Sequence, residues 1–335
     1  MAHVQTVLGP VPAADLGRVM AHEHLLSLTP GPWLPAGGGL DPVAIAVAAL
    51  DGLTDRGFGT IVDLSPYGVV GRDADGSNTA LLAEISRRSG LHVVSGTALY
   101  LESWTPAWAA GASIDELADR LTSDLDTGIG GSGVRAGILG EQATGLDTMT
   151  EHEERTLRAA ARAMRRTGAA LMTHTTHGTL ALRQIEILAD EGVALDRVVI
   201  GHLDTQLDPA LVRRVLGTGA NVAIDTIGKQ EWDFFLGPPS DRGDGEFTKR
   251  AFHRADSGRA DLVARLVADG FGDRVVLAQD LTGAEIWMNP STHGMHGYRY
   301  LHDVFAPMLA ERGVTADQYE QLIRHTPARL LEVGQ

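Results

Sequence analysis

Short apolar runs alternate with longer amphipathic segments along most of the chain. The apolar runs are rich in β-branched residues and carry little charge, as is typical of strands buried on both faces. The longer segments repeat apolar positions with the spacing of a helix face. The runs that predict strands are 17–24, 59–65, 91–100, 134–141, 168–174, 196–202, 219–226 and 273–280. The segments that predict helices are 41–56, 78–89, 113–126, 151–167, 181–191, 209–216 and 257–269.

Regular strand–helix alternation predicts a parallel sheet, and eight strands are the number that closes into a barrel. We therefore expect an α/β protein with a (β/α)₈ TIM barrel. An open doubly wound sheet is the alternative, because the same alternation builds it. Residues 4–17 predict a short N-terminal β-hairpin that covers the bottom of the barrel. A long loop over 281–297, a helix over 298–312 and a C-terminal helix over 316–324 are expected after the last strand.

No internal repeat, low-complexity tract or interdomain linker interrupts the pattern, so one domain is expected over 1–335. The Pro- and Gly-rich stretch 29–39 is expected to be a loop on the catalytic face.

Composition narrows the class of protein. The chain has 335 residues, of which 44% are apolar and 21% charged, as in ordinary soluble globular proteins. It has no apolar run near the roughly 20 residues that span a bilayer, and its start lacks the pattern of a signal peptide, so a cytoplasmic location is expected. A formal charge of -15 argues against nucleic acid and anionic membranes as partners. Because there is no cysteine, any transition metal must be held by His, Asp or Glu.

Potential metal ligands stand at the ends of five predicted strands. The first strand ends in His22-Glu23-His24, and the fourth, fifth, sixth and eighth end in Glu141, His174, His202 and Asp280. The carboxyl ends of barrel strands meet at one mouth, where barrel active sites lie. Residues i and i+2 of a strand share a side, so both imidazoles of the first strand should face inward, with Glu23 facing away. Nitrogen and oxygen donors of this kind suit two divalent ions, Zn²⁺ first, or Mn²⁺, Co²⁺ or Fe²⁺.

Each ligand alone has a simpler explanation. A His-X-His sequence arises by chance, His174 or His202 could be a buried core histidine, and Asp280 could cap the end of its strand. Glu141 is harder to explain, because an unpaired carboxylate at a buried strand end is costly. The occurrence of all six at the same end of the strands favours a shared metal site.

Several segments together resemble the phosphotriesterase family of the amidohydrolase superfamily. They are MAHEHL, TIVDLSPYGVVGRDADGSNTALLAEIS, GTALY, VRAGILGEQATG, LMTHTTHG, VVIGHLDTQLD, AIDTIGKQ, VVLAQD and HTPARLL. They run from the first strand to the last helix, so the resemblance covers nearly the whole chain. It implies a binuclear metal-dependent hydrolase.

The resemblance also implies residue roles. His22, His24 and Asp280 would bind the more buried metal. His174 and His202 would bind the more exposed metal, and Glu141 and a hydroxide would bridge the two. Asp280 would take the proton of the attacking hydroxide. Tyr100 matches an aromatic residue beside the substrate pocket, or simply packs at its strand end. Arg72 and Asp73 match a GRD segment, where we expect a role in loop structure.

Two departures from the family pattern bear on the substrate. True phosphotriesterases bridge their metals with a carboxylated lysine, and the matching position here is Gly140, followed by Glu141. This resembles the glutamate-bridged, phosphotriesterase-related branch. The phosphotriesterases also have a proton relay of Asp and His residues after strands six and seven. Here those segments read Leu203-Asp204-Thr205 and Asp225-Thr226, so the relay is absent.

The expected function is hydrolysis of a lactone or carboxylic ester. The alternatives are an amidase acting on a small N-acyl compound, with phosphotriester hydrolysis as a weak side reaction, and a non-catalytic small-molecule binding protein on a retained barrel. Basic residues on the last loops, Lys229, Arg250, His293, His296 and Arg299, predict an anionic substrate, or are solvated loop charges. Lys229, Arg250 and His296 are the candidate substrate contacts, and a homodimer is one expected assembly.

Overall fold

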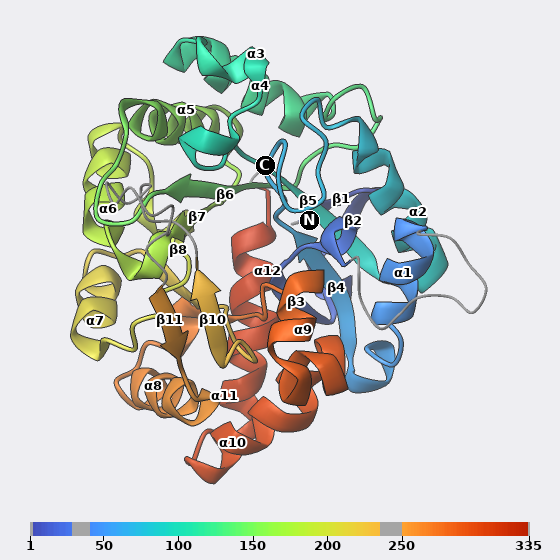
Figure 1. The fold of residues 1–335 in the computed structure, drawn as a ribbon, viewed down its shortest axis with the longest axis vertical. Coiled ribbons are helices and arrows are strands. Elements are labelled where there is room, and N and C mark those ends of the chain that lie inside the picture. The colour runs from blue at the N-terminus through green and yellow to red at the C-terminus, as the bar shows by residue number, and fades with distance from the viewer. Residues whose placement is uncertain (1–2, 29–40, 235–249, 334–335) are drawn as a thin grey trace, which may run out of the picture.

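Eight parallel strands form a nearly closed barrel in the computed structural model, which describes residues 3–28, 41–234 and 250–333 (Figure 1). The strands follow one another around the barrel in chain order. They are β3 (Arg18–Glu23), β4 (Phe58–Asp63), β5 (His92–Thr97), β6 (Ile138–Thr144), β7 (Leu171–Thr175), β8 (Val198–Ile200), β9 (Asn221–Ile224) and β12 (Val275–Leu277). The predicted (β/α)₈ barrel is therefore confirmed.

Helices surround this barrel (Figure 1). They are α1 (Pro42–Ala49), α2 (Ala80–Ser89), α3 (Ala107–Ala110), α4 (Ile114–Asp126), α5 (Glu151–Thr167), α6 (Ala181–Asp190), α7 (Pro209–Gly217), α8 (Asp256–Ala268), α9 (Gly283–Met288), α10 (Ala306–Glu311), α11 (Ala316–Glu320) and α12 (Thr326–Leu331). The outer faces of the strands and the inner faces of the helices share one large apolar cluster.

Side chains from the inner faces of the strands fill the barrel. They form a second apolar cluster, separate from the one between the strands and the helices. Its members include Val19, Val62, Val94 and Val276, each at most 2% exposed. Branched aliphatic side chains of this kind pack the interior of TIM barrels and leave no pore. The core therefore occupies the lower barrel, and the polar strand ends lie above it.

An antiparallel hairpin and the last helix close the barrel bottom, as predicted for the hairpin. The hairpin pairs β1 (His3–Thr6) with β2 (Gly9–Pro12). Val4 joins the interior cluster together with Leu330 and Leu331 of α12. A β-bridge between His3 and Val333 joins the hairpin to the segment that follows α12.

The first and last strands of the barrel meet at the mouth. The backbone N–H of Asp280 donates to the carbonyl oxygen of His22 at 3.0 Å. The side chain of Glu23 accepts hydrogen bonds from the N–H groups of Gln279 and Leu281, both at 2.9 Å. The first and last strands therefore close the barrel at the segments that carry candidate metal ligands.

Three predictions of local structure differ from the structure. Strand β6 begins at Ile138 and not at residue 134, because Ala136 N–H donates to Asp124 in α4 and not to a neighbouring strand. The expected loop over 281–297 contains α9 and a further helical turn, Pro290–Gly294. The C-terminal helix continues past residue 324 through a π-helical turn, Gln321–His325, into α12, which contains Pro327. A small hairpin of β10 (Glu231–Phe234) and β11 (Arg250–His253) was not predicted.

The Pro- and Gly-rich stretch 29–39 lies outside the described residues. Among the residues that the structure describes, the helices are too short or too polar to traverse a lipid bilayer. The assignment of one domain to 1–335 stays a prediction.

The packing of the hairpin against the barrel makes Gly137 a sensitive position. A Cβ at Gly137 would lie 2.3 Å from the carbonyl oxygen of Gln5 in β1. We expect Gly137→Ala to lower the free energy of unfolding by about 1–3 kcal/mol, the usual cost of overpacking. Gly217→Ala in α7 is the matched control, because a Cβ there meets no atom within 4 Å. Thermal unfolding of the two variants gives the comparison, and equal melting temperatures would contradict this view of the hairpin.

Candidate metal centre

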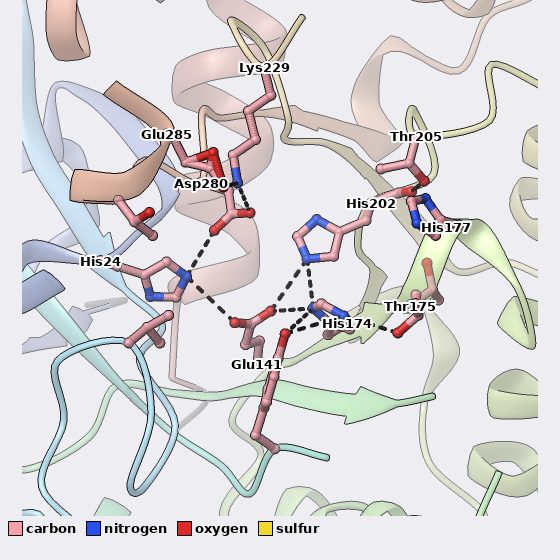
Figure 2. Close-up of a pocket in the computed structure, with 14 residues that line it drawn as sticks. His24, Glu141, His174, Thr175, His177, His202, Thr205, Lys229, Asp280 and Glu285 are labelled. Carbon is pink, nitrogen blue, oxygen red and sulfur yellow. Dashed lines mark hydrogen bonds and ion pairs between the residues drawn. The ribbon is translucent and has the colours of Figure 1, made fainter. Parts of the chain in front are cut away.

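Polar side chains from five strand ends line one cavity of about 170 Å³ at the mouth of the barrel (Figure 2). Five of the six predicted ligands line it directly, and the sixth, His22, is fully buried. All six side chains are buried, with exposed fractions of at most 8%. The structure therefore brings together every candidate ligand that the sequence predicts: His22, His24, Glu141, His174, His202 and Asp280.

Glu141 lies at the centre of this group. Its Oε1 is 3.5 Å from Nε2 of His24, and its Oε2 is 3.6 Å from Nε2 of His22. On the other side, Oε2 is 3.0 Å from Nδ1 of His174 and 3.4 Å from Nε2 of His202. Two of the three groups of possible ligands among the described residues, His22–His24–Glu141 and Glu141–His174–His202, therefore share this carboxylate, and the third group joins His22 and His202 to Asp225.

Asp280 completes the first group. Its Oδ1 is 2.9 Å from Nε2 of His24 and 3.7 Å from Nε2 of His22. Donor atoms about 2.1 Å from a tetrahedral Zn²⁺ lie roughly 3.4 Å from one another. The spacing of the donor atoms around Glu141 and Asp280 is thus that of a set built around cations.

The side chain of His22 gives an independent test of whether a metal fits. Among the described residues, none forms a hydrogen bond with its Nε2, although the imidazole is fully buried. Its Nδ1, by contrast, is 2.9 Å from Oδ2 of Asp225. A buried polar atom without a partner is costly in a folded protein. A metal ion at Nε2 would remove that cost, so the residues present fit a divalent cation.

Asp225 is a functional candidate that the sequence analysis did not find. Its Oδ1 is 3.0 Å from Nδ1 of His202 and accepts the backbone N–H of His202 at 2.9 Å, while Oδ2 faces His22. One carboxylate thus holds an imidazole from each of the two candidate groups. An outer carboxylate fixes the tautomer of a ligating histidine and raises its basicity. The sequence signal was its position at the end of β9, at the same mouth as the ligands. Ser65 contacts His24 in the same way, because its Oγ lies 3.1 Å from Nδ1 of His24.

Glu23 also acts from outside the ligand group. It is fully buried and points away from the cavity, as predicted, and its two oxygens bind the N–H groups on either side of Asp280. Asp280 itself has φ 48°, in the left-handed region that non-glycine residues rarely adopt. The Glu23 carboxylate therefore holds the backbone in the conformation that presents Asp280 to the cavity.

Two irregularities in the strands deliver the ligands. The pairing of β3 with β4 shifts register between Met20 and Glu23, so strict alternation does not by itself set the direction of His22 and His24. The pairing of β6 with β7 shifts register between Leu139 and Gln142, around Gly140 and Glu141. A local change at this point is what a short glutamate in place of a long modified lysine requires. β-bulges of this kind re-aim side chains beside active sites.

The charges of the site favour ionised carboxylates. Burial alone would raise the pKa of Glu141, but the neighbouring imidazoles, His174 first, bring it well below the usual range. For Asp280, burial is likewise overcome by Lys229 and the imidazoles, so its pKa is also well below normal. Ligating carboxylates must be ionised to bind a metal, and both groups meet this condition at neutral pH.

The predicted substrate contacts have different outcomes. Tyr100 lines the cavity, with its ring edge-on to His174 at 5.0 Å between centroids. Lys229 lines it too, but its ammonium is paired with Asp280 and Glu285. His296 is not among the described residues that line the cavity, and its ring packs against Tyr300 at 5.8 Å. The side chain of Arg250 lies outside the described residues.

The predicted basic cluster at the mouth is therefore smaller than expected. His293 is a core histidine whose Nε2 lies 2.8 Å from the carbonyl oxygen of Ile227, and burial lowers its pKa to about 4. Glu285, which the sequence analysis missed, adds a carboxyl group to the cavity, and burial raises the pKa of that group. It stands on α9, in a segment predicted to be a loop, so no periodicity pointed to it.

The residues at the positions of the family's relay turn away from Asp280. The hydroxyl of Thr226 donates to Oδ2 of Asp204 at 2.6 Å, and Thr205 donates to the carbonyl oxygen of His202 at 2.7 Å. Asp204 is also paired with the fully buried Arg259 at 2.8 Å. These contacts build the wall of the barrel and provide no path for a proton from Asp280.

Arg72 and Asp73 hold a loop together, as expected. Arg72 is 4% exposed and pairs with Asp63 at 3.1 Å, and Asp73 accepts a hydrogen bond from Ser77 at 3.2 Å.

A model of the phosphotriesterase family matches residues 2–331. The chain belongs to the phosphotriesterase family. A phosphotriesterase homology protein of Mycobacterium tuberculosis is 31% identical, covering 99% of this chain and 98% of that protein. An N-acetyltaurine hydrolase of Homo sapiens is 26% identical, covering 98% of this chain and 97% of that protein. A solved structure described as organophosphate hydrolysis activity engineered from a weak promiscuous lactonase template is 29% identical, covers 98% of this chain and 99% of its own, and has a TM-score of 0.78.

Membership of this family of binuclear metal hydrolases makes the protein a hydrolase with candidate ligands for two metals. The assignment of individual ligands and the identity of the metal are our proposals.

The shared carboxylate predicts the effect of its removal. We expect Glu141→Ala to bind fewer than two metals per chain and to lose nearly all activity while the barrel still folds, because two cations would lose the negative charge between them. Metal content after reconstitution with Zn²⁺, circular dichroism and turnover check this. Glu84→Ala, at an exposed position of α2, is the control. Unchanged turnover in the Glu141 variant would show that another residue bridges.

Asp225 predicts a milder effect on the same centre. We expect Asp225→Ala to weaken metal binding by about 10–100-fold, the usual consequence of losing a carboxylate behind ligating histidines. Competition with a chromophoric chelator measures this, with Asp119→Ala on the surface of α4 as the control. An affinity equal to that of the unaltered protein would mean that the Asp225 contacts do not support the ligands.

Proposed function

We propose that the protein hydrolyses a small lactone or carboxylic ester at the mouth of the barrel. The observation that carries this proposal is the position of Asp280, which faces the candidate metal ligands with one oxygen while the residues at the relay positions turn away from it. A carbonyl substrate needs one proton carrier between the attacking water and the leaving oxygen, and Asp280 is placed for that role.

Two divalent cations, when bound, supply Lewis acidity that lowers the pKa of a water and polarises the carbonyl oxygen of a substrate. The six candidate ligands would hold them. Asp280 would take a proton from the attacking water at its carboxylate and pass it to the departing oxygen. Tyr100 and the side chains of β7 would position the acyl part, since they line the same cavity. A cavity of about 170 Å³ suits a small substrate.

A small N-acyl amide is the second candidate. It is supported by the human relative named N-acetyltaurine hydrolase, which this chain matches over 98% of its length. An amine leaves only after protonation, and Asp280 could supply that proton as it would for an alcohol. The lactonase template among the solved structures supports the first candidate in the same way. An anionic substrate and a homodimer stay predictions, and the intact ligand set argues against a non-catalytic binding protein.

The absent relay predicts the ranking of substrates. We expect the best lactone, ester or small amide to exceed the best phosphotriester by at least about a hundredfold in kcat/KM, roughly 2.7 kcal/mol of transition-state preference. The measurement compares paraoxon-like triesters with sugar lactones, acyl lactones, aryl esters and N-acyl amino acids on zinc-loaded protein. A triester as the best substrate would contradict the proposal, and an N-acyl compound as the best would select the second candidate.

A further inference from the structure

Lys229 is an unusual residue in this chain. Of the 28 basic residues only two are lysines, Lys229 and Lys249, and the rest are arginines. The side chain of Lys229 is 2% exposed and lies in the wall of the catalytic cavity. An ammonium group is costly to bury unless it is paired and hydrogen-bonded. Its contacts therefore indicate what the buried charge does.

The ammonium of Lys229 binds two carboxylates. It forms a short hydrogen bond with Oδ2 of Asp280, and it lies 3.3 Å from Oε1 of Glu285 (Figure 2). The other oxygen of Asp280, Oδ1, faces Nε2 of His24 at 2.9 Å. The two oxygens of Asp280 thus have different partners, with the candidate metal ligands on one side and the lysine on the other.

The loop that carries Lys229 is held from the opposite side by a second buried charge network. The carbonyl oxygen of Lys229 accepts a hydrogen bond from Arg259 at 2.8 Å, and the N–H of Gly228 donates to Asp256 at 3.1 Å. Arg259 and Asp256 are themselves paired at 2.7 Å, and both are at most 1% exposed. The fold therefore fixes where the lysine side chain begins as well as where it ends.

The place of Lys229 is also informative. The family's relay residue after the seventh barrel strand corresponds to Thr226, which is directed to Asp204. Three residues further along the same loop, Lys229 reaches Oδ2 of Asp280. The carboxylates of Asp280 and Glu285 compensate its charge, so the lysine is not an isolated cation awaiting an anionic substrate.

We infer that Lys229 is a positioning residue, which holds Oδ2 of Asp280 so that Oδ1 faces the candidate metal ligands, with Glu285 as the counter-charge of the lysine. This inference rests on the proposed function, because it takes Asp280 as the carrier of the proton to the leaving group. A lysine–glutamate pair thereby occupies the place of the absent relay.

The first test does not need turnover. The protein is loaded with ¹¹³Cd²⁺ alone, and its cadmium NMR spectrum is compared between the unaltered protein, Lys229→Met and the control Arg299→Met. Arg299 is exposed, and its side chain lies beside Gly52 in the segment before β4, away from the cavity. We expect Lys229→Met to shift or broaden the resonance of the ion that Asp280 binds and to leave the other in place, with no change in the control. An unchanged cadmium spectrum in Lys229→Met would overturn the inference.

The second test separates positioning of Asp280 from direct contact of Lys229 with the substrate. We expect Lys229→Met to lower kcat by at least about tenfold while KM changes by less than about threefold, because the lysine acts through Asp280 and not on the bound substrate. With a series of substituted phenyl acetates, the dependence of kcat on the pKa of the leaving group should also steepen, because proton delivery becomes less effective.

The double variant Lys229→Met with Glu285→Gln removes both charges, so that Glu285 is not left as a buried carboxylate without its lysine. If it retains the loss in kcat, the positioning role is supported. If it restores the kcat of the unaltered protein, Lys229 only neutralises Glu285 and the inference fails. A rise in KM at constant kcat would make Lys229 a substrate contact and also overturn it. Absence of acyl hydrolysis by the unaltered protein would contradict the proposed function, while the cadmium spectra would still decide the role of Lys229.

Discussion

A carboxylate buried among four imidazoles is the constraint on which the rest of the site depends. Glu141 is 2% exposed, and the ring nitrogens of His22, His24, His174 and His202 lie 3.0 to 3.6 Å from its oxygens. Imidazoles and carboxylates at these separations, with Nε2 of His22 left without a hydrogen bond among the described residues, form an arrangement that cations would stabilise. The barrel makes this arrangement possible, because its strand ends bring side chains from distant parts of the chain to one mouth.

A second layer of buried polar groups holds the ligands in place. Asp225 binds the outer nitrogens of His22 and His202, Glu23 binds the backbone around Asp280, and Arg259 holds the loop that carries Lys229. Each of these groups is fully buried or nearly so, and each has charged or hydrogen-bonding partners. These contacts organise the mouth although they lie outside the cavity. They account for the buried polar residues above the apolar interior of the barrel.

The sequence predicted the barrel and the ligand set because both follow from repeated local patterns. Strand and helix periodicity located all eight barrel strands, and the ligands stand where those strands end. The supporting residues were harder to find, because their roles depend on side-chain direction. In the sequence, Asp225 stands only within a segment that departs from the family's relay. The basic loop residues predict either an anionic substrate or solvated charges, whereas the structure pairs Lys229 with Asp280 and Glu285. His296 was predicted at the cavity from its place in a basic loop, but the unpredicted helical turns of that segment direct it to Tyr300.

The most direct test of the binuclear centre is anomalous diffraction from crystals of the zinc-loaded protein, measured on both sides of the zinc absorption edge. The account predicts two zinc peaks in each chain, one beside His22, His24 and Asp280 and one beside His174 and His202, with the carboxylate of Glu141 between them. A single peak, or peaks that do not share Glu141, would contradict it.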